Sequence, residues 1–66
     1  MKRYVKEFAN DILKRDRECV LMPEVVKTER KAKVERLLKC YRMRILSDFE
    51  AVQQLVYIAE QGGEIG

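Results

Sequence analysis

The 66-residue chain contains no histidine, one serine and only three glycines. Histidine is the side chain most often used as a general base and as a metal ligand, so the chain lacks the commonest residue for either role. No glycine-rich loop is present to hold a phosphate group. Carboxylates such as Glu7 and Asp11 have the spacing of one solvated helical face. We therefore expect no enzymatic activity, no cofactor and no small-molecule substrate.

Cysteine is also scarce, because Cys19 and Cys40 are the only two and they form no Cys-x-x-Cys motif. A structural zinc site normally takes four cysteine or histidine ligands, which this chain does not possess. A disulfide would require a loop folded against the middle of a helix, and a reducing cytoplasm would keep both thiols free. We expect two small, buried or half-buried apolar side chains and no metal.

Long apolar runs are absent too. No segment approaches the roughly 20 consecutive apolar residues that span a bilayer, and the N-terminus has no apolar signal core. Charged residues make up 38% and hydrophobic residues 47% of the chain, a balance typical of a helical globular protein. These features predict a soluble cytoplasmic protein without membrane contacts.

Three amphipathic segments fill most of the chain and predict an all-α three-helix bundle, with residues 1–66 forming a single domain. The expected helices cover about residues 2–16, 23–44 and 47–61, followed by a loose tail at 62–66. Residues 14–18 are interpreted as the fraying end of the first helix. Pro23 is expected at the first position of the second helix, where its missing amide is harmless. Gly62 and Gly63 are expected to end the third.

The strongest local signal is a corner before the third helix. Ser47 followed by Glu50 is a capping box, in which each side chain bonds the backbone amide of the other residue. The short connection at 44–46 forces the second and third helices to be antiparallel neighbours. Two apolar stripes are expected to join them, consisting of Val34, Leu37, Leu38, Tyr41 and Ile45 on one helix and Phe49, Val52, Leu55, Val56 and Ala59 on the other. Arg30 interrupts the first stripe.

This corner resembles a known family. The pattern Tyr41-x-x-x-Ile45-Leu46-Ser47-x-x-Glu50, preceded by Leu37 and Leu38, is similar to the helix–corner–helix of short C-terminal (SHOCT) domains. The phrase from Tyr4 to Asp11 is similar to the opening of small uncharacterised helical proteins from Gram-positive phages and conjugative elements. Arg44 stands where the family pattern has glycine. The resemblance implies oligomerisation or partner binding without known catalysis.

The apolar residues of the third helix cover about half of its circumference, which is wider than one packing contact requires. A chain of this size buries only about 60% of its unfolded surface, so a partner subunit is an expected source of stability. We predict a non-enzymatic assembly module of a phage or conjugative element that forms a homo-oligomer, most simply a dimer, or binds another protein. The predicted contact residues are Ala51, Leu55 and Ile58. The alternative is that these residues form intrachain core beneath the first helix.

Charge supplies a second hypothesis. The net charge of +3 combines a basic middle helix with an acidic third helix. A nucleic-acid-binding protein would use the basic helix for phosphate contacts, through Lys27, Lys31, Arg36, Lys39 and Arg42, together with Arg30 and Arg44. Opposing this, intrahelical pairs are expected for Glu24 with Lys27, Glu29 with Lys33 and Glu35 with Lys39. The third helix also offers only glutamines among acids, at positions 53, 54 and 61, for reading base edges. An acidic protein partner is the remaining possibility.

Overall fold

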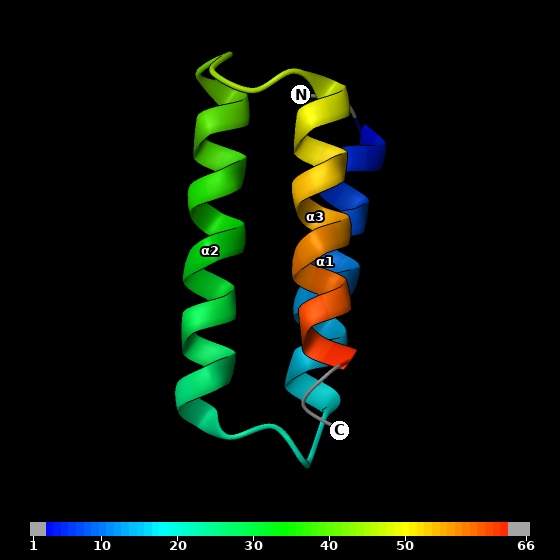
Figure 1. The fold of residues 1–66 in the computed structure, drawn as a ribbon, viewed down its shortest axis with the longest axis vertical. Helices are drawn as coiled ribbons and strands as arrows, with labels where there is room; N and C mark the ends of the chain where they lie inside the picture. The colour runs from blue at the N-terminus through cyan, green and yellow to red at the C-terminus, as the bar shows by residue number, and fades with distance from the viewer. Residues whose placement is uncertain (1–2, 64–66) are drawn as a thin grey trace.

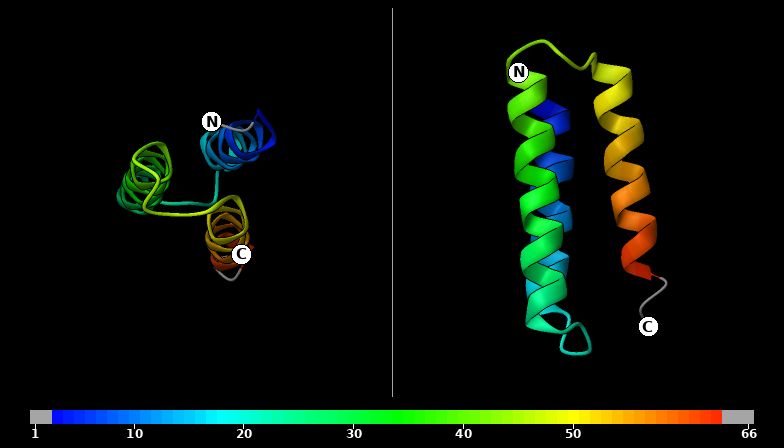
Figure 2. Two further views of the ribbon diagram at one scale, coloured as in Figure 1. Left: turned by 90° about the horizontal axis from the view of Figure 1, so that it is seen from above. Right: turned by 60° about the vertical axis from the view of Figure 1, so that its left-hand side comes forward.

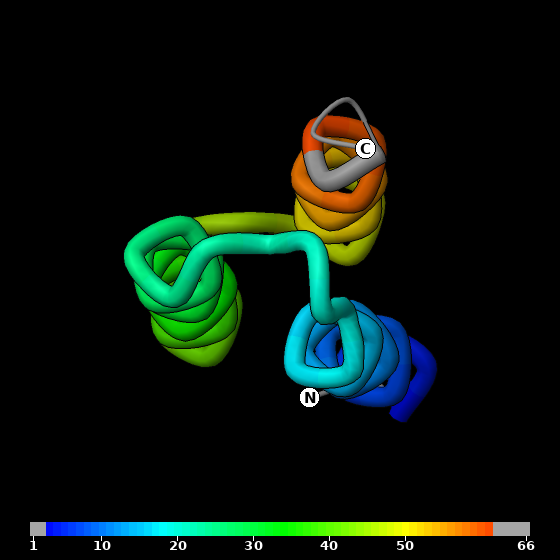
Figure 3. Tube along the Cα trace, turned by 90° about the horizontal axis from the view of Figure 1, so that it is seen from below, coloured from blue at the N-terminus to red at the C-terminus, as the bar shows by residue number. Residues whose placement is uncertain are grey.

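The computed structural model describes residues 3–63, which form three helices and no strand. Helix α1 covers Arg3–Glu18, α2 covers Glu24–Arg42 and α3 covers Asp48–Gly63. The chain runs down α1, up α2 and down α3, so that α1 and α3 are parallel and α2 is antiparallel to both (Figure 1). Seen along the long axis, the helices occupy the corners of a triangle (Figures 2 and 3). The predicted all-α three-helix bundle is confirmed.

The helix ends differ slightly from the prediction. Helix α1 continues to Glu18 because Asp16, placed in a fraying end by sequence, is buried and ion-paired. Pro23 lies before α2 as its N-cap rather than inside it, and its carbonyl accepts from the amides of Val26 and Lys27. Helix α3 continues through Gly63 instead of ending before the glycines. Lys2 and the tail residues 64–66 lie outside the described residues.

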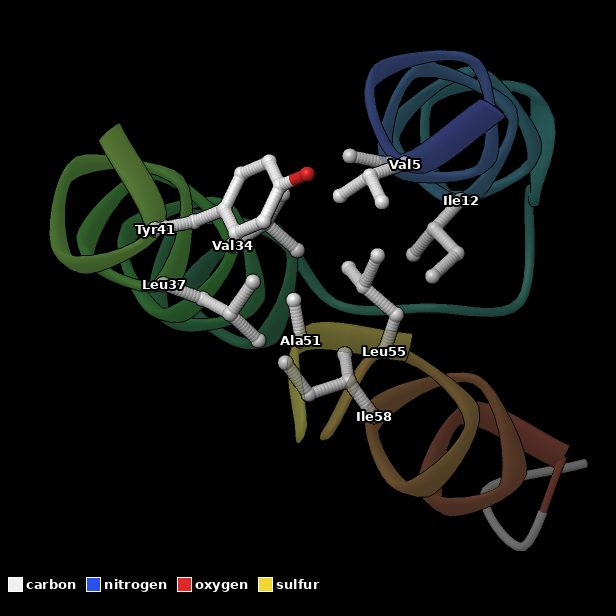
Figure 4. Packing of buried hydrophobic residues seen from close by; sticks show 9 residues of the cluster. Val5, Ile12, Val34, Leu37, Tyr41, Ala51, Leu55 and Ile58 are labelled. Atoms are coloured by element: carbon white, nitrogen blue, oxygen red, sulfur yellow. The ribbon is translucent and has the colours of Figure 1, made fainter. Parts of the chain in front are cut away.

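The core takes three residues from each helix at helical spacing. They are Val5, Ala9 and Ile12 from α1, Val34, Leu37 and Tyr41 from α2, and Ala51, Leu55 and Ile58 from α3. Their side chains converge on the bundle axis (Figure 4). Because every helix faces two neighbours, the buried line of each helix points between them, and half-buried residues lie on its flanks.

The expected stripe of α3 is partly wrong for this reason. Phe49, predicted to pack against α2, is 70% exposed, and Ile45 at the corner is 62% exposed. A two-helix hairpin would bury these residues. The presence of α1 rotates the buried line of α3 onto Ala51, Leu55 and Ile58, which leaves Phe49 and Val56 on the outside.

Helix α2 ends in a Schellman motif. The amide of Ile45 donates to the carbonyl of Cys40 at 2.9 Å, and the amide of Arg44 donates to the carbonyl of Tyr41 at 3.0 Å. This motif places the residue after the C-cap in the left-handed region that glycine favours. Arg44 occupies that position with a φ of 62°. An arginine therefore adopts the conformation for which the family pattern has glycine.

The predicted capping box begins α3. The Glu50 amide donates to Ser47 Oγ at 3.2 Å, and the Ser47 amide donates to Glu50 Oε1 at 3.3 Å. The Ser47 carbonyl then accepts the first helical bond, from Ala51. The Tyr41 hydroxyl also donates to Asp48 Oδ1, which joins the end of α2 to the start of α3. The corner is thus fixed by backbone and side-chain bonds together.

The connection between α1 and α2 covers the core with a single side chain. Of residues 19–22, only Met22 is buried. Val20 is 93% exposed and Leu21 is also exposed. Met22 alone reaches inward because the turn at residues 20–22 points its two preceding side chains to solvent.

Candidate interaction surfaces

A buried ion pair between α1 and α2 lies beneath the surfaces described below. Arg30 Nε donates to Asp16 Oδ2 at 2.7 Å, and Arg30 Nη1 donates to the carbonyl of Ile58 at 2.7 Å. The two side chains are only 7% and 10% exposed. Arg30 therefore contacts all three helices, and it is a structural residue rather than a phosphate contact. Sequence reasoning missed the pair because Asp16 was placed at the fraying end of the first helix, and Arg30 was treated as an interruption of an apolar stripe and as a phosphate contact.

The predicted contact residues Ala51, Leu55 and Ile58 are part of the intrachain core. Ala51 and Leu55 are completely buried and Ile58 is nearly so. A second copy cannot reach them while the bundle is folded, so the prediction of a partner interface at these positions is wrong. The structure instead supports the alternative, in which α1 covers this part of α3.

The apolar residues of α3 that lie outside the core line are on a different part of the helix, on the flank toward α1. Gln54 and Tyr57 line a groove with α2, so Val52 and Val56 lie on the opposite flank, toward α1. By the same argument, Leu13 lines a cavity with α2, which places Tyr4 and Phe8 on the α3 side of α1.

These residues, on the adjoining flanks and outer sides of α1 and α3, are together called the apolar band. It consists of Tyr4, Phe8, Phe49, Val52 and Val56. Tyr4 and Phe49 are the second residues of two parallel neighbouring helices, so both lie at the same end of the bundle (Figure 1). Tyr4 is 52%, Phe49 70% and Val56 39% exposed, while Phe8 and Val52 are half-buried. The band crosses two helices and presents aromatic and β-branched side chains to solvent.

A different surface lies between α2 and α3. A groove of about 560 Å³ has Leu37, Cys40, Leu46 and Ile58 in its lining. Lys33 and Arg36 line its α2 side, and its α3 side is lined by Gln53, Gln54, Tyr57 and Gln61. Among the side chains that the structure describes, no carboxylate lines the groove. The glutamines, which the sequence placed among acids, thus face a cationic rim instead.

The basic residues of α2 differ in the ion pairs and hydrogen bonds that they form. Lys27 Nζ pairs with Glu24 at 3.7 Å and donates to the Arg17 carbonyl at 3.3 Å, so it stabilises the C-terminal end of α1. Lys31 pairs with Glu35 at 4.0 Å, where Lys39 had been expected as the partner of that glutamate.

The remaining predicted phosphate contacts are exposed. Arg36, which also lines the groove, Lys39 and Arg42 are exposed, and within residues 3–63 none of them has an acidic group within 4 Å. Binding of nucleic acid through these residues stays a prediction. The set of residues expected to contact phosphate is smaller, because Arg30 is buried and half-buried Lys27 is engaged by Glu24 and the Arg17 carbonyl.

The two cysteines lie in different parts of the structure, form no disulfide with each other, and are both half-buried. Cys19 shares a cavity with Met22 and Arg30 at the α1–α2 connection, whereas Cys40 lines the groove between α2 and α3. Among the described residues, no three histidine, cysteine or acidic side chains come together in a way that would hold a metal ion. Across residues 3–63, no helix combines the length and the apolar content needed to cross a bilayer.

Comparison with known proteins adds no relative. The chain matches no protein-family model, no curated protein and no solved structure. The resemblance of the corner to short C-terminal domains therefore stays a prediction.

Proposed function

We propose that the protein is a non-enzymatic assembly module that forms a dimer through the apolar band. The observation that carries this proposal is the exposure of Tyr4, Phe49 and Val56 on two adjacent helices. Water contact with such side chains costs about 25 cal/mol per Å² of apolar surface, and a partner removes that contact. Contiguous exposed apolar residues typically mark interaction sites on soluble proteins.

A second copy is the occupant that the band fits best. A two-fold axis pairs the same patch on both chains, so that one apolar band covers the other without a complementary surface elsewhere. The charged residues nearest to the band on the helical projection are Asp11, Arg15 and Glu60, which are of mixed sign. Because both signs occur beside the band, these residues do not favour a different protein that carries charge of a single sign. A 66-residue chain with a nine-residue core also gains stability from a subunit.

The size of the surface sets the expected affinity. Helices α1 and α3 each have 16 residues, which corresponds to about 24 Å of length. Two such helices lying side by side offer roughly 400–500 Å² per chain, which is at the lower end of specific interfaces. We therefore expect a reversible dimer that dissociates at about micromolar concentration rather than an obligate one.

Sedimentation equilibrium over a range of concentrations tests the proposal. The chain should approach a mass twice its 7.8 kDa at high concentration. Phe49→Asp should raise the dissociation constant by at least about tenfold, because it places a charge inside the apolar contact. The variant should still fold, since an acidic residue in the first turn of a helix is favourable.

Val20→Asp is the matched control, because it makes the same kind of change at a more exposed apolar residue outside the band. It should leave the dissociation constant unchanged. A wild-type chain that stays monomeric at several hundred micromolar would overturn the proposal, as would equal effects of the two variants. The setting, a phage or conjugative element, is proposed from the sequence resemblance alone.

A further inference from the structure

We propose that the groove between α2 and α3 binds an acidic amphipathic helix of a partner protein. The groove is a separate surface from the apolar band, because it lies on the other flank of α3. The proposed dimer and the proposed binding groove can therefore be tested independently of each other. Three properties of the groove identify its occupant: its shape, its floor and its charge.

The shape fits a helix. The α2 side runs from Lys33 to Cys40 and the α3 side from Gln53 to Gln61, which correspond to about 10 and 12 Å at a helical rise of about 1.5 Å per residue. Helix-in-groove recognition uses anchors at positions i, i+3 or i+4 and i+7, which span a similar length. A helix laid between α2 and α3 would become the fourth helix of a bundle.

The floor suits an apolar face. Leu37 and Ile58 close the bottom of the groove, and half-buried Leu46 and Cys40 offer apolar surface above them. Tyr57 is 62% exposed and borders the groove from α3. Covering the Tyr57 ring and Leu46 would remove apolar surface from water while leaving the hydroxyl at the polar rim.

The positive charge on the α2 side of the groove favours a ligand that carries carboxylates. Lys33 and Arg36 are one helical turn apart, are exposed, and have no acidic group within 4 Å among residues 3–63. Lys39, three residues after Arg36, is also exposed and adds positive charge beside this rim. Arg36 can bind a carboxylate with two parallel hydrogen bonds. Across the groove, three glutamine amides can bond the remaining polar groups of the ligand.

The other occupants fit less well. Duplex DNA accepts a protruding helix in its major groove, whereas this site is concave with an apolar floor. A second copy of the chain presents Glu7, Asp11 and Glu18 on one exposed face of α1. Lys14 and Arg15 flank these acids and Arg3 pairs with Glu7, so that face has mixed charge and matches the cationic rim less well. A foreign helix with glutamates along one edge and leucines beside them satisfies the floor and the rim together.

The probe is a synthetic, fluorescein-labelled helix of about 14 residues, with leucines at i, i+4 and i+7 and glutamates on the adjoining flank. Binding to the full-length protein is followed by fluorescence anisotropy. A lysine-for-glutamate version of the same peptide is the charge control. We expect the acidic peptide to bind at about 100 μM or below and the lysine version to bind at least about tenfold more weakly.

Protein variants locate the site. The double variant Lys33→Glu and Arg36→Glu should weaken the acidic peptide by at least about tenfold and strengthen the lysine peptide. Lys6→Glu with Lys14→Glu, a charge-matched pair on exposed positions of α1, should change neither affinity. Phe49→Asp should also leave peptide binding intact, which separates this proposal from dimerisation.

Three outcomes would overturn the inference. One is no binding of the acidic peptide at about 1 mM, and another is equal binding by the wild type and the Lys33 and Arg36 double variant. The third is tighter binding of a single-stranded or duplex oligonucleotide that the same double variant abolishes, which would assign the groove to nucleic acid. Circular dichroism of each variant confirms that the helices are retained.

Discussion

Arg30 and Asp16 form an ion pair inside the bundle, with 2.7 Å between Arg30 Nε and Asp16 Oδ2. The same guanidinium donates to the carbonyl of Ile58, so that one side chain of α2 fixes the positions of α1 and α3. Within the described residues, no buried side-chain polar atom lacks a hydrogen-bond partner. The N-terminal half of α2, which has few apolar residues, is thus held to the bundle by a polar contact.

Breaking this pair should destabilise the fold severely. Arg30→Met leaves the Asp16 carboxylate buried without its partner, and Asp16→Leu does the same to Arg30, so each should cost about 3–5 kcal/mol. A chain of this length has a total stability of only about 3–10 kcal/mol. Urea denaturation followed by circular dichroism measures the loss, and Arg17→Met at an exposed site serves as the control.

The double variant Asp16→Leu with Arg30→Met distinguishes pairing from packing. Because no unpaired charge remains, it should regain most of the stability that either single variant loses. The double-mutant cycle should therefore give a large coupling energy. Losses that simply add would show that the two side chains do not depend on each other.

Replacing Arg44 by glycine should stabilise the protein. Arg44 has a φ of 62°, where a Cβ atom costs about 1–2 kcal/mol and glycine has no such penalty. Part of the gain is offset because glycine adds freedom to the unfolded chain. We expect a net increase of about 0.5–1 kcal/mol in the free energy of unfolding for Arg44→Gly. Arg44→Ala keeps the Cβ, so it should give no comparable gain, and equal effects would refute the backbone explanation.

Removing the cap of α3 should weaken the corner. Ser47→Ala deletes the oxygen that accepts from the Glu50 amide and should cost about 1 kcal/mol. Ser47→Asp supplies another acceptor at the same place and should retain most of the stability. Thermal unfolding of the three proteins ranks them. An alanine variant as stable as the wild type would mean that the hydrogen bond contributes nothing in solution.

Salt should separate the two proposed interactions. The apolar band buries aromatic and aliphatic side chains, so the dimer dissociation constant should change little between low and high ionic strength. The acidic peptide depends on Lys33 and Arg36, and its affinity should fall as salt screens these exposed charges. Titrations of both equilibria in the same buffers check this. A dimer that dissociates on addition of salt would point to an electrostatic interface instead of the band.

Local signals predicted the helices and the corner. Apolar periodicity located all three helices, and the spacing of Ser47 and Glu50 located the cap, because both depend on residues close in sequence. The exposed face of α3 depended on where α1 packs, which no local pattern specifies. Phe49 was therefore placed inside and Ala51 at a partner contact, each opposite to its position in the bundle.

The buried ion pair left a signal that could have been used. Asp16 follows Ile12 by four residues on the core line of α1, and Arg30 precedes Val34 by four on the core line of α2. Two opposite charges, each on the buried line of its helix, indicate a buried pair. Arg30 was placed on the apolar stripe of its helix by sequence, but an opposite charge on the buried line of the first helix was not considered.

The most direct test of the proposed assembly is an isotope-filtered NOE experiment on an equal mixture of labelled and unlabelled chains at high concentration. A dimer formed through the apolar band should give intermolecular contacts from the ring protons of Tyr4 and Phe49 to the methyl groups of Val52 and Val56. Intermolecular contacts confined to Tyr57 or to Val20, or none at all, would contradict it.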